Sequence, residues 1–433
     1  MTVAERAVAT QPLTGVRLLD LTNGWSGPLG TRMLADHGAE VIRVESVHYY
    51  DFLRGLRNPP AGSAGKWPKG DPGERPWERN PFFNETNRNK RGVTIHLPAA
   101  DGVDLIKRLA AECDVIVTSF RPGVLEKYGL TTKEFENLRP DIIIVNLSVW
   151  GRGGPDERYA GYAPAMEAVA GYHEMTGYLG GPPMLSNSNF GDPISGIYAT
   201  LAIVGALDFR RRTGQGQFIN YSQREGLLCH LGDALMDYQL NRRNPSRLGN
   251  RHPIFAPQGC YPCRGDDKWI SISIRNDAEW TAFCKVMQLS ELAEDPRFTD
   301  TNGRQANHDE LDDLIGKATQ HRDNYDLMHQ LQRCGIPSAP VADIAEIFHE
   351  PQLRSRGFFQ SMTKEWCGTE EYPGFPIKLS RTPGSITRAT PRLGEDNEYV
   401  FREILGMNDE ELMALSDKQV IGDYPMPGAD GVG

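Results

Sequence analysis

Short apolar runs alternate with amphipathic stretches in the first half of the chain. Residues 16–21 form an apolar run of the length of a buried strand, and Gly27 and Pro28 open a helical stretch that Gly38 ends. The apolar positions of 40–44 then predict a second strand. A strand, a helix and a further strand in this order are typical of a βαβ unit with parallel strands.

The same alternation continues through the first half of the sequence. Residues 102–113 are amphipathic and predict a helix, and Thr131 with Glu134 has the capping-box pattern that opens a short helix. Further strands are predicted at 114–119, 141–147 and 217–221, and further helices at 193–212 and 223–239. This alternation predicts an α/β fold with a Rossmann-like, doubly wound parallel sheet.

A change of pattern near Asn244 predicts a second domain. The chain has 433 residues, above the size at which a single core usually stops growing. After the polar, turn-prone stretch 244–253, a strand at 269–274 is followed by three helical stretches, 278–287, 309–319 and 324–334. We expect a large domain at 1–225, a linker helix at 226–244, a smaller α+β domain at 245–330, and a C-terminal segment at 331–433 that returns to the large domain.

Charge and cysteine usage narrow the classes of partner. The formal net charge is −10, which argues against a general nucleic-acid or anionic-membrane binder. Residues 1–14 lack the apolar core of a signal peptide, and no apolar stretch is long enough to span a membrane. The seven cysteines are scattered, and Cys260 and Cys263 lack a second pair that would complete a zinc site. We therefore expect a cytoplasmic protein without a bound metal.

Asp192 is the strongest candidate for chemistry. Gly191 precedes it, Pro193 follows it, and the sequence then predicts one helix up to Arg212. This pattern places Asp192 at the helix N-cap, where unpaired N–H groups and the helix dipole favour an ionised carboxylate. An ionised carboxylate is the form that a nucleophile needs. The same pattern is also that of an ordinary capping residue, and the two roles are compatible.

Other candidate binding residues follow predicted strands or precede one. Phosphate or carbonyl oxygens bind naturally where a strand ends and a helix begins, as at residues 23–26. A plain turn between strand and helix explains this segment equally well. A basic group at the start of a strand can hold phosphates, although such a group is more often a solvated edge. The first segment is Asn23, Gly24, Trp25 and Ser26; the basic group contains Lys90 and Arg91; Phe120 and Lys127 follow the strand that ends at Ser119.

Ordered short motifs give the chain a resemblance to the class III CoA-transferase family, which includes formyl-CoA and carnitine CoA-transferases. The match covers about residues 14–410, and the ordered set is far more specific than any one motif. The motifs are GVRLLDLT at 15–22, LADHGAEVIRVE at 34–45, NKR at 89–91, FRPG at 120–123, GD at 191–192, RRTGQGQ at 211–217, GNRHP at 249–253, DPRF at 295–298, GIPSAPV at 335–341 and LGE at 393–395. The second half also resembles the benzylsuccinate branch.

The resemblance implies an acyl-CoA:carboxylate CoA-transferase in which Asp192 is the catalytic aspartate. Its substrates would be an acyl-CoA and a free carboxylic acid, and CoA would be carried as a thioester on Asp192. No metal and no cofactor beyond coenzyme A is implied. The implied CoA-binding residues are Asn23, Gly24, Trp25, Ser26, Lys90, Arg91, Phe120, Lys127 and Tyr128.

The resemblance also implies an interlocked homodimer and leaves two alternative functions open. An α-methylacyl-CoA racemase would need a histidine where this chain has Tyr162, and a phenol is a poor base near neutral pH. A non-catalytic acyl-CoA-binding protein is the other alternative, which the presence of Asp192 disfavours. Trp25 stands where formyl-CoA transferases carry glutamine, and Trp25 and Phe255 together indicate a larger, partly apolar acid.

Overall fold

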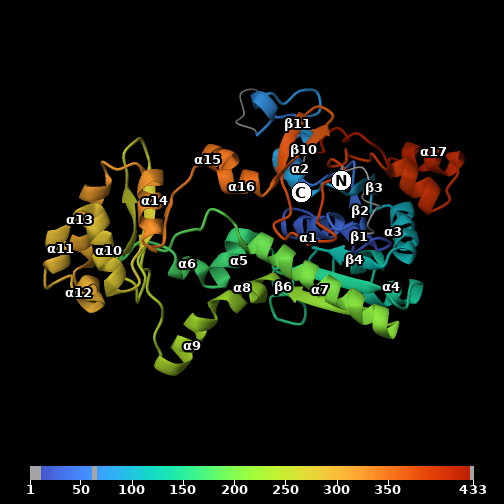
Figure 1. Cartoon of the computed structure of the whole chain (residues 1–433). Coiled ribbons are helices and arrows are strands. Elements are labelled where there is room, and N and C mark those ends of the chain that lie inside the picture. The colour runs from blue at the N-terminus through green and yellow to red at the C-terminus, as the bar shows by residue number, and fades with distance from the viewer. Residues whose placement is uncertain (1–10, 61–65, 430–433) are drawn as a thin grey trace. The chain divides into compact units, whose positions relative to one another are not determined.

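The computed structural model describes residues 11–60 and 66–429, which divide into two units (Figure 1). The larger unit combines the chain up to Ala170 with Asn187–Leu235 and the chain from Arg354 onwards. The smaller unit combines Gly171–Ser186 with Met236–Leu353. The smaller unit is thus wider than the domain expected at 245–330: its main segment extends from Met236 to Leu353, and it also includes a segment that precedes Asp192 in the sequence.

A six-stranded parallel sheet forms the centre of the larger unit. Its strand order is β3-β2-β1-β4-β5-β6, so the direction in which strands are added reverses between β1 and β4. The strands are β1 (Arg17–Leu21), β2 (Glu40–Glu45), β3 (Arg91–Thr94), β4 (Val115–Thr118), β5 (Ile143–Ser148) and β6 (Gln217–Ser222). The predicted α/β fold with a parallel sheet is confirmed.

Helices cover both faces of this sheet. Successive residues of a strand point to opposite faces, so the apolar strands place side chains on both faces, and each face packs against helices. On β1, Leu18 packs in one core with Leu34 of α1 and Ile203 of α7, whereas Leu19 packs in another with Leu105 of α3 and Phe135 of α4. These helices are α1 (Ser26–Ala35), α3 (Ala100–Glu112), α4 (Thr132–Leu138) and α7 (Gly191–Thr213).

The remaining elements of the larger unit are short, apart from a helix near its end. The predicted helix 223–239 is divided in the structure into α8 (Gln223–Leu228), a 3₁₀ turn at Cys229–Leu231 and α9 (Gly232–Asn241), and α9 crosses into the smaller unit. The others are α2 (Pro81–Thr86), α5 (Ala163–Val169), the antiparallel pair β10 (Phe359–Lys364) and β11 (Gly368–Pro373), a π-helical turn at Tyr399–Ile404 and α17 (Asp409–Asp417), with 3₁₀ turns at Phe52–Arg54, Pro68–Gly70, Pro76–Glu78 and Glu126–Tyr128.

The smaller unit has its own sheet and core. Its strands are antiparallel in the order β7-β8-β9, and Trp280, Phe283 and Phe298 are among its fully buried side chains. The three predicted helices appear as α10, α13 and α14, which confirms a smaller α+β part. The elements are α6 (Tyr172–Met175), β7 (Gln258–Pro262), β8 (Trp269–Ser273), α10 (Asp277–Met287), α11 (Ser290–Glu294), α12 (Thr301–Ala306), α13 (His308–Thr319), α14 (Asn324–Arg333), β9 (Ser338–Pro340), α15 (Ile344–His349) and α16 (Pro351–Ser355), the last crossing into the larger unit.

Candidate active site

A cavity of about 380 Å³ opens at the carboxyl ends of the central strands of the larger unit. Residues that follow β1, β4 and β5 line it, together with Asp192 at the start of α7. Because β1 and β4 flank the point where the strand order reverses, the cavity lies where open α/β sheets bind their ligands. The topology therefore supports this cavity as the candidate active site.

Asp192 lies in the first turn of α7, two positions further into the helix than the sequence predicts. Phe190 occupies the N-cap position and Gly191 is the first helical residue, so the predicted N-cap role of Asp192 is wrong. A Cβ at Gly191 would lie 2.7 Å from the terminal methyl carbon of Met166, so glycine lets α5 and α7 pack here without a shift of that side chain. The helix can begin before Asp192, and the carboxylate is left to line the cavity.

Two glycines bring α1 close enough to α7 for its first residue to reach Asp192. A Cβ at Gly30 would lie 2.8 Å from the carbonyl oxygen of Gly196, and a Cβ at Gly196 would lie 2.7 Å from that of Ser26. Neither position accepts a side chain without a shift of backbone. In this packing, the hydroxyl of the buried Ser26 donates a hydrogen bond to the Asp192 carboxylate.

The Asp192 carboxyl has a raised pKa, contrary to the expectation from helix capping. Burial raises the pKa to about 6, the negative charge of Glu167 adds to the rise, and the hydrogen bond from Ser26 opposes it. Partial burial in the cavity wall thus outweighs the position in the first turn. At neutral pH the carboxylate is still mostly ionised, and its higher basicity favours nucleophilic attack.

Five of the predicted CoA-binding residues line this cavity with Asp192. The loop after β1 is held by backbone hydrogen bonds: Asn23 N–H donates to the Ser119 hydroxyl and Gly24 N–H donates to the Asp51 carboxylate, each at 3.0 Å. The five residues are Asn23, Gly24, Trp25, Ser26 and Phe120.

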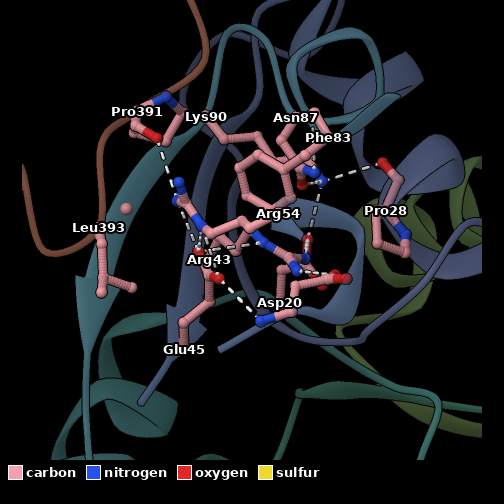
Figure 2. A network of polar contacts seen from close by, with 12 residues as sticks. Asp20, Pro28, Arg43, Glu45, Arg54, Phe83, Asn87, Lys90, Pro391 and Leu393 are labelled. Carbon is pink, nitrogen blue, oxygen red and sulfur yellow. Dashed lines mark hydrogen bonds and ion pairs between the residues drawn. The ribbon is translucent and has the colours of Figure 1, made fainter. Parts of the chain in front are cut away.

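Lys90 does not reach the cavity, because its ammonium group is buried among partners in the protein. Figure 2 shows its Nζ directed at Asp20, the Pro28 carbonyl and Asn87, at 3.0, 2.9 and 2.8 Å. Burial lowers the pKa of Lys90 to about 8, with Asp20 acting against it. On Asp20, burial is outweighed by Lys90 and Arg43, which hold the pKa of that carboxyl at about 2. Lys90 is therefore a buried partner of Asp20 and does not line the cavity.

Arg91, Lys127 and Tyr128 also lie outside the cavity lining. Arg91 is the first residue of β3 and so lies at the amino ends of the strands, whereas the cavity lies at their carboxyl ends. There it pairs with Glu40 and Asp396. Lys127 is exposed, and Tyr128 packs against the core in the turn that follows the cavity residue Val124. The sequence analysis gave the basic group before β3 and the loop after β1 the same binding role. In a parallel sheet, a residue before a strand lies at the amino ends of the strands and a residue after a strand at their carboxyl ends.

A buried ionic network behind the loop after β1 was missed from the sequence. Asp51 accepts from Gly24 N–H and pairs with Arg43, whose guanidinium also donates to the Thr22 carbonyl at 3.0 Å. The network continues from Arg54 to Glu45 and Glu78, and Figure 2 shows Arg54 beneath the Phe83 ring, 3.8 Å from its centroid. The available signal was Arg43 within the predicted strand 40–44 and Glu45 directly after it.

Aromatic side chains dominate the wall of the cavity. Phe52 meets Tyr162 edge-on, with ring centroids 6.1 Å apart, and Trp25 meets Phe82 in the same way at 4.9 Å. Phe255, which the sequence grouped with Trp25, instead stacks on His252 within the smaller unit. The aromatic members of the lining are Trp25, Tyr49, Tyr50, Phe52, Phe120, Trp150, Tyr159 and Tyr162.

Three further observations concern metal binding, cysteines and membranes. Within residues 11–60 and 66–429, no group of three or more histidine, cysteine, aspartate or glutamate side chains is arranged to hold a metal ion. All seven cysteines are free thiols. The helices of the described chain include none with both the length and the apolar character needed to cross a bilayer.

Comparisons with known proteins show the family. The family model described as CoA-transferase family III matches residues 13–397. The chain is 33% identical to a succinyl-CoA–D-citramalate CoA-transferase of Chloroflexus aurantiacus, over 95% of this chain and 98% of that protein, and 31% identical to a succinate–glutarate CoA-transferase of Agrobacterium fabrum, over 91% and 96%. A CAIB/BAIF family protein from Brucella suis has a matching structure with a TM-score of 0.80 at 29% identity, over 91% of this chain and all of that one. The resemblance drawn from the motifs and the predicted enzyme class are confirmed, and the chain belongs to CoA-transferase family III.

Proposed function

We propose that this enzyme moves coenzyme A from an acyl-CoA to a free carboxylic acid through an aspartyl-CoA thioester on Asp192. The observation that carries the proposal is the position of Asp192 in a family III CoA-transferase. Its carboxylate lines a cavity at the switch point of the sheet, bound by Ser26 and with its pKa raised to about 6. A basic, partly desolvated carboxylate is suited to attack a thioester.

The proposed transfer proceeds through successive attacks on acyl carbons, with Asp192 as the covalent carrier. A carboxylate oxygen of Asp192 attacks the acyl carbon, the C–S bond breaks, and a mixed anhydride and CoA thiolate result. The thiolate then attacks the Asp192 carbonyl carbon, which forms the aspartyl-CoA thioester and releases the donor acid as a carboxylate. The acceptor carboxylate attacks the aspartyl-CoA carbonyl carbon, the C–S bond breaks, and a second mixed anhydride and CoA thiolate result. The thiolate then attacks the acceptor's acyl carbon, which gives the new acyl-CoA and releases Asp192 as a carboxylate. The apolar wall assists by excluding water, which would otherwise hydrolyse the anhydride or the thioester.

Coenzyme A is proposed to bind along the loop after β1 and the turn after β4. Backbone N–H groups near the amino end of α1 suit the thioester or phosphate oxygens. Arg121 is the one lysine or arginine that lines the cavity among the described residues, and it supplies positive charge there. Lys127 and Tyr128 lie next along the same turn, where they are proposed to contact the outer part of CoA.

The acceptor acid is proposed to carry an apolar chain. Eight aromatic side chains line the cavity, whereas its charged lining is confined to Arg121, Glu157 and Asp192 among the described residues. The two curated relatives are named for succinyl-CoA or succinate, so succinyl-CoA is the first donor to test. A panel of acids matched in length, with and without a second carboxylate, tests the apolar preference by kcat/KM. Preference for the dicarboxylates would overturn it.

The enzyme is proposed to be cytoplasmic, because its seven free thiols suit a reducing compartment.

The enzyme is also proposed to be a homodimer of this chain. Helix α7 exposes Ile197, Leu201 and Val204 at a spacing that aligns them on one face. Light scattering should give the dimer mass for the wild type and a monomer for Leu201→Glu. Met413→Glu, at an equally exposed apolar residue on α17, is the control and should remain dimeric. A monomeric wild type would contradict the homodimer.

The experiment for the catalytic proposal is to trap the intermediate. The protein is mixed with succinyl-CoA, treated with hydroxylamine, and the modified residue is located by mass spectrometry. We expect a hydroxamate on Asp192, and none in Asp192→Asn. Modification elsewhere, or full transfer by the variant, would sink the proposal. Exchange of α-hydrogen for deuterium without any acyl transfer would instead point to racemase chemistry.

A further inference from the structure

Glu167 is a buried acid in the wall that holds Asp192. It belongs to α5, and only 1% of its surface is exposed. Its Oε1 accepts a hydrogen bond of 3.2 Å from the backbone N–H of Gly191, the residue directly before Asp192. One carboxylate thus holds the first turn of the helix that carries the other.

Glu167 also contributes charge at short range. A Cβ built at Gly191 would lie 3.6 Å from the Cγ of Glu167, so α5 and α7 are in contact at this point. The charge of Glu167 adds to the burial that raises the pKa of Asp192, and the Ser26 hydroxyl from α1 opposes both. Apart from Asp192, the charged side chains that line the cavity among the described residues are Arg121 and Glu157.

We propose that Glu167 is a positioning residue that fixes the first turn of α7 and, by its negative charge, sets the pH range in which Asp192 attacks a thioester. This inference rests on the proposed function of Asp192. Burial is the larger cause of the basicity of Asp192, and Glu167 adds to it from α5, outside the cavity lining.

The charge changes during transfer explain why a second acid assists. In the free enzyme, the carboxylates of Asp192 and Glu167 repel each other. When the Asp192 oxygen bonds to the acyl carbon and the C–S bond breaks, the negative charge leaves with the thiolate. In the anhydride and in the aspartyl-CoA thioester, Asp192 is neutral, so the repulsion is absent. Glu167 therefore raises the free energy of the reacting state relative to both intermediates and favours acylation of Asp192.

The pH dependence of intermediate formation tests this inference. The covalent CoA adduct is measured by intact mass after acid quenching of enzyme mixed with succinyl-CoA between pH 4.5 and 8. Glu167→Gln removes the charge and preserves the shape, so the pKa of Asp192 should fall and the midpoint of the acid limb should move down by about one pH unit. Glu167→Met, a second neutral replacement of similar length, should shift it in the same direction.

Two charge-matched controls separate this effect from a structural one. Glu167→Asp keeps the charge, so its midpoint should stay near the wild-type value even if the rate falls. Glu157→Gln removes one negative charge from the same cavity, and its midpoint should not move. Adduct in the wild type with unchanged midpoints in both neutral Glu167 variants overturns this inference alone. No adduct in the wild type at any pH overturns the proposed function and this inference with it.

Discussion

Asp20 and Asp192 are two aspartates that contact the same helix and yet have opposite electrostatic settings. Both accept from hydroxyl groups of α1, Asp20 from Thr31 at 2.7 Å and Asp192 from Ser26. Asp20 is also paired with Lys90 and Arg43, and its pKa is held at about 2. Asp192 faces a second acid, Glu167, and its pKa is raised to about 6. Burial raises the pKa of both carboxyls; on Asp20 the cations Lys90 and Arg43 outweigh it, whereas on Asp192 burial prevails and the charge of Glu167 adds to it.

The largest expected effect comes from removing the reactive member of this comparison. Asp192→Asn should lower kcat by at least about a thousandfold, because an amide does not attack a thioester. Its thermal midpoint should match the wild type, since the amide can still accept from Ser26. Steady-state transfer and a melting curve measure both. A variant that retains a tenth of the activity would show that Asp192 is not the nucleophile.

The structural member of the pair is broken by Lys90→Met. This change leaves Asp20 buried without its closest cation and should cost about 3–5 kcal/mol in the free energy of unfolding. Denaturant unfolding measures it. The double variant Lys90→Met with Asp20→Asn should recover part of the loss, because the unpaired charge is gone. An equal stability of Lys90→Met and wild type would contradict a structural role and restore Lys90 as a candidate CoA ligand.

The close packing of α1 on α7 is tested by Gly196→Ala. The new methyl group would meet the Ser26 carbonyl oxygen at 2.7 Å, so the helices must separate, at an expected cost of about 2 kcal/mol. Separation also weakens the hydrogen bond from Ser26 to Asp192. Gly205→Ala, on the same helix with open space around it, should leave stability unchanged or slightly higher. Equal stabilities for the two variants would show that the contact is not tight.

The smallest expected effect concerns the hydroxyl that opposes the rise in the pKa of Asp192. Ser26→Ala removes a hydrogen bond to the charged form, so the pKa of Asp192 should rise above about 6. The acid limb of the transfer rate should therefore move to higher pH, opposite in sign to Glu167→Gln. A pH–rate profile over pH 4.5–8 measures the shift. Movement in the acidic direction would mean that Ser26 does not bind the ionised carboxylate.

Much of the fold followed from the sequence, because its signals are local. The apolar runs at 16–21 and 40–44, with a glycine-bounded helix between them, are enough to predict parallel strands on either side of a helix. The cavity loop at Asn23 was found in the same way, since it follows the first strand. The N-cap assignment of Asp192 failed by two residues, because the N-cap is Phe190, which lacks the polar side chain on which the capping pattern relies.

The partners of charged residues could not be predicted in this way. Lys90 and Arg91 are adjacent in the sequence and were given one role, yet Lys90 is sealed against Asp20 and Arg91 lies at the far edge of the sheet. Glu167 carries no signal in its short helix, although it touches the residue before Asp192. These relations join residues that are from two dozen to seventy positions apart.

The sequence by itself determined the alternation of strands and helices, the family, and Asp192 as the candidate nucleophile, because apolar periodicity and ordered motifs are properties of neighbouring residues. The tertiary structure alone decided which charges are neutralised and which are left reactive. Electrostatic energies depend on distance and burial in space, so an aspartate paired with Lys90 and Arg43 is an inert anion, whereas the aspartate in the cavity wall is made basic chiefly by burial, with Glu167 adding to the effect.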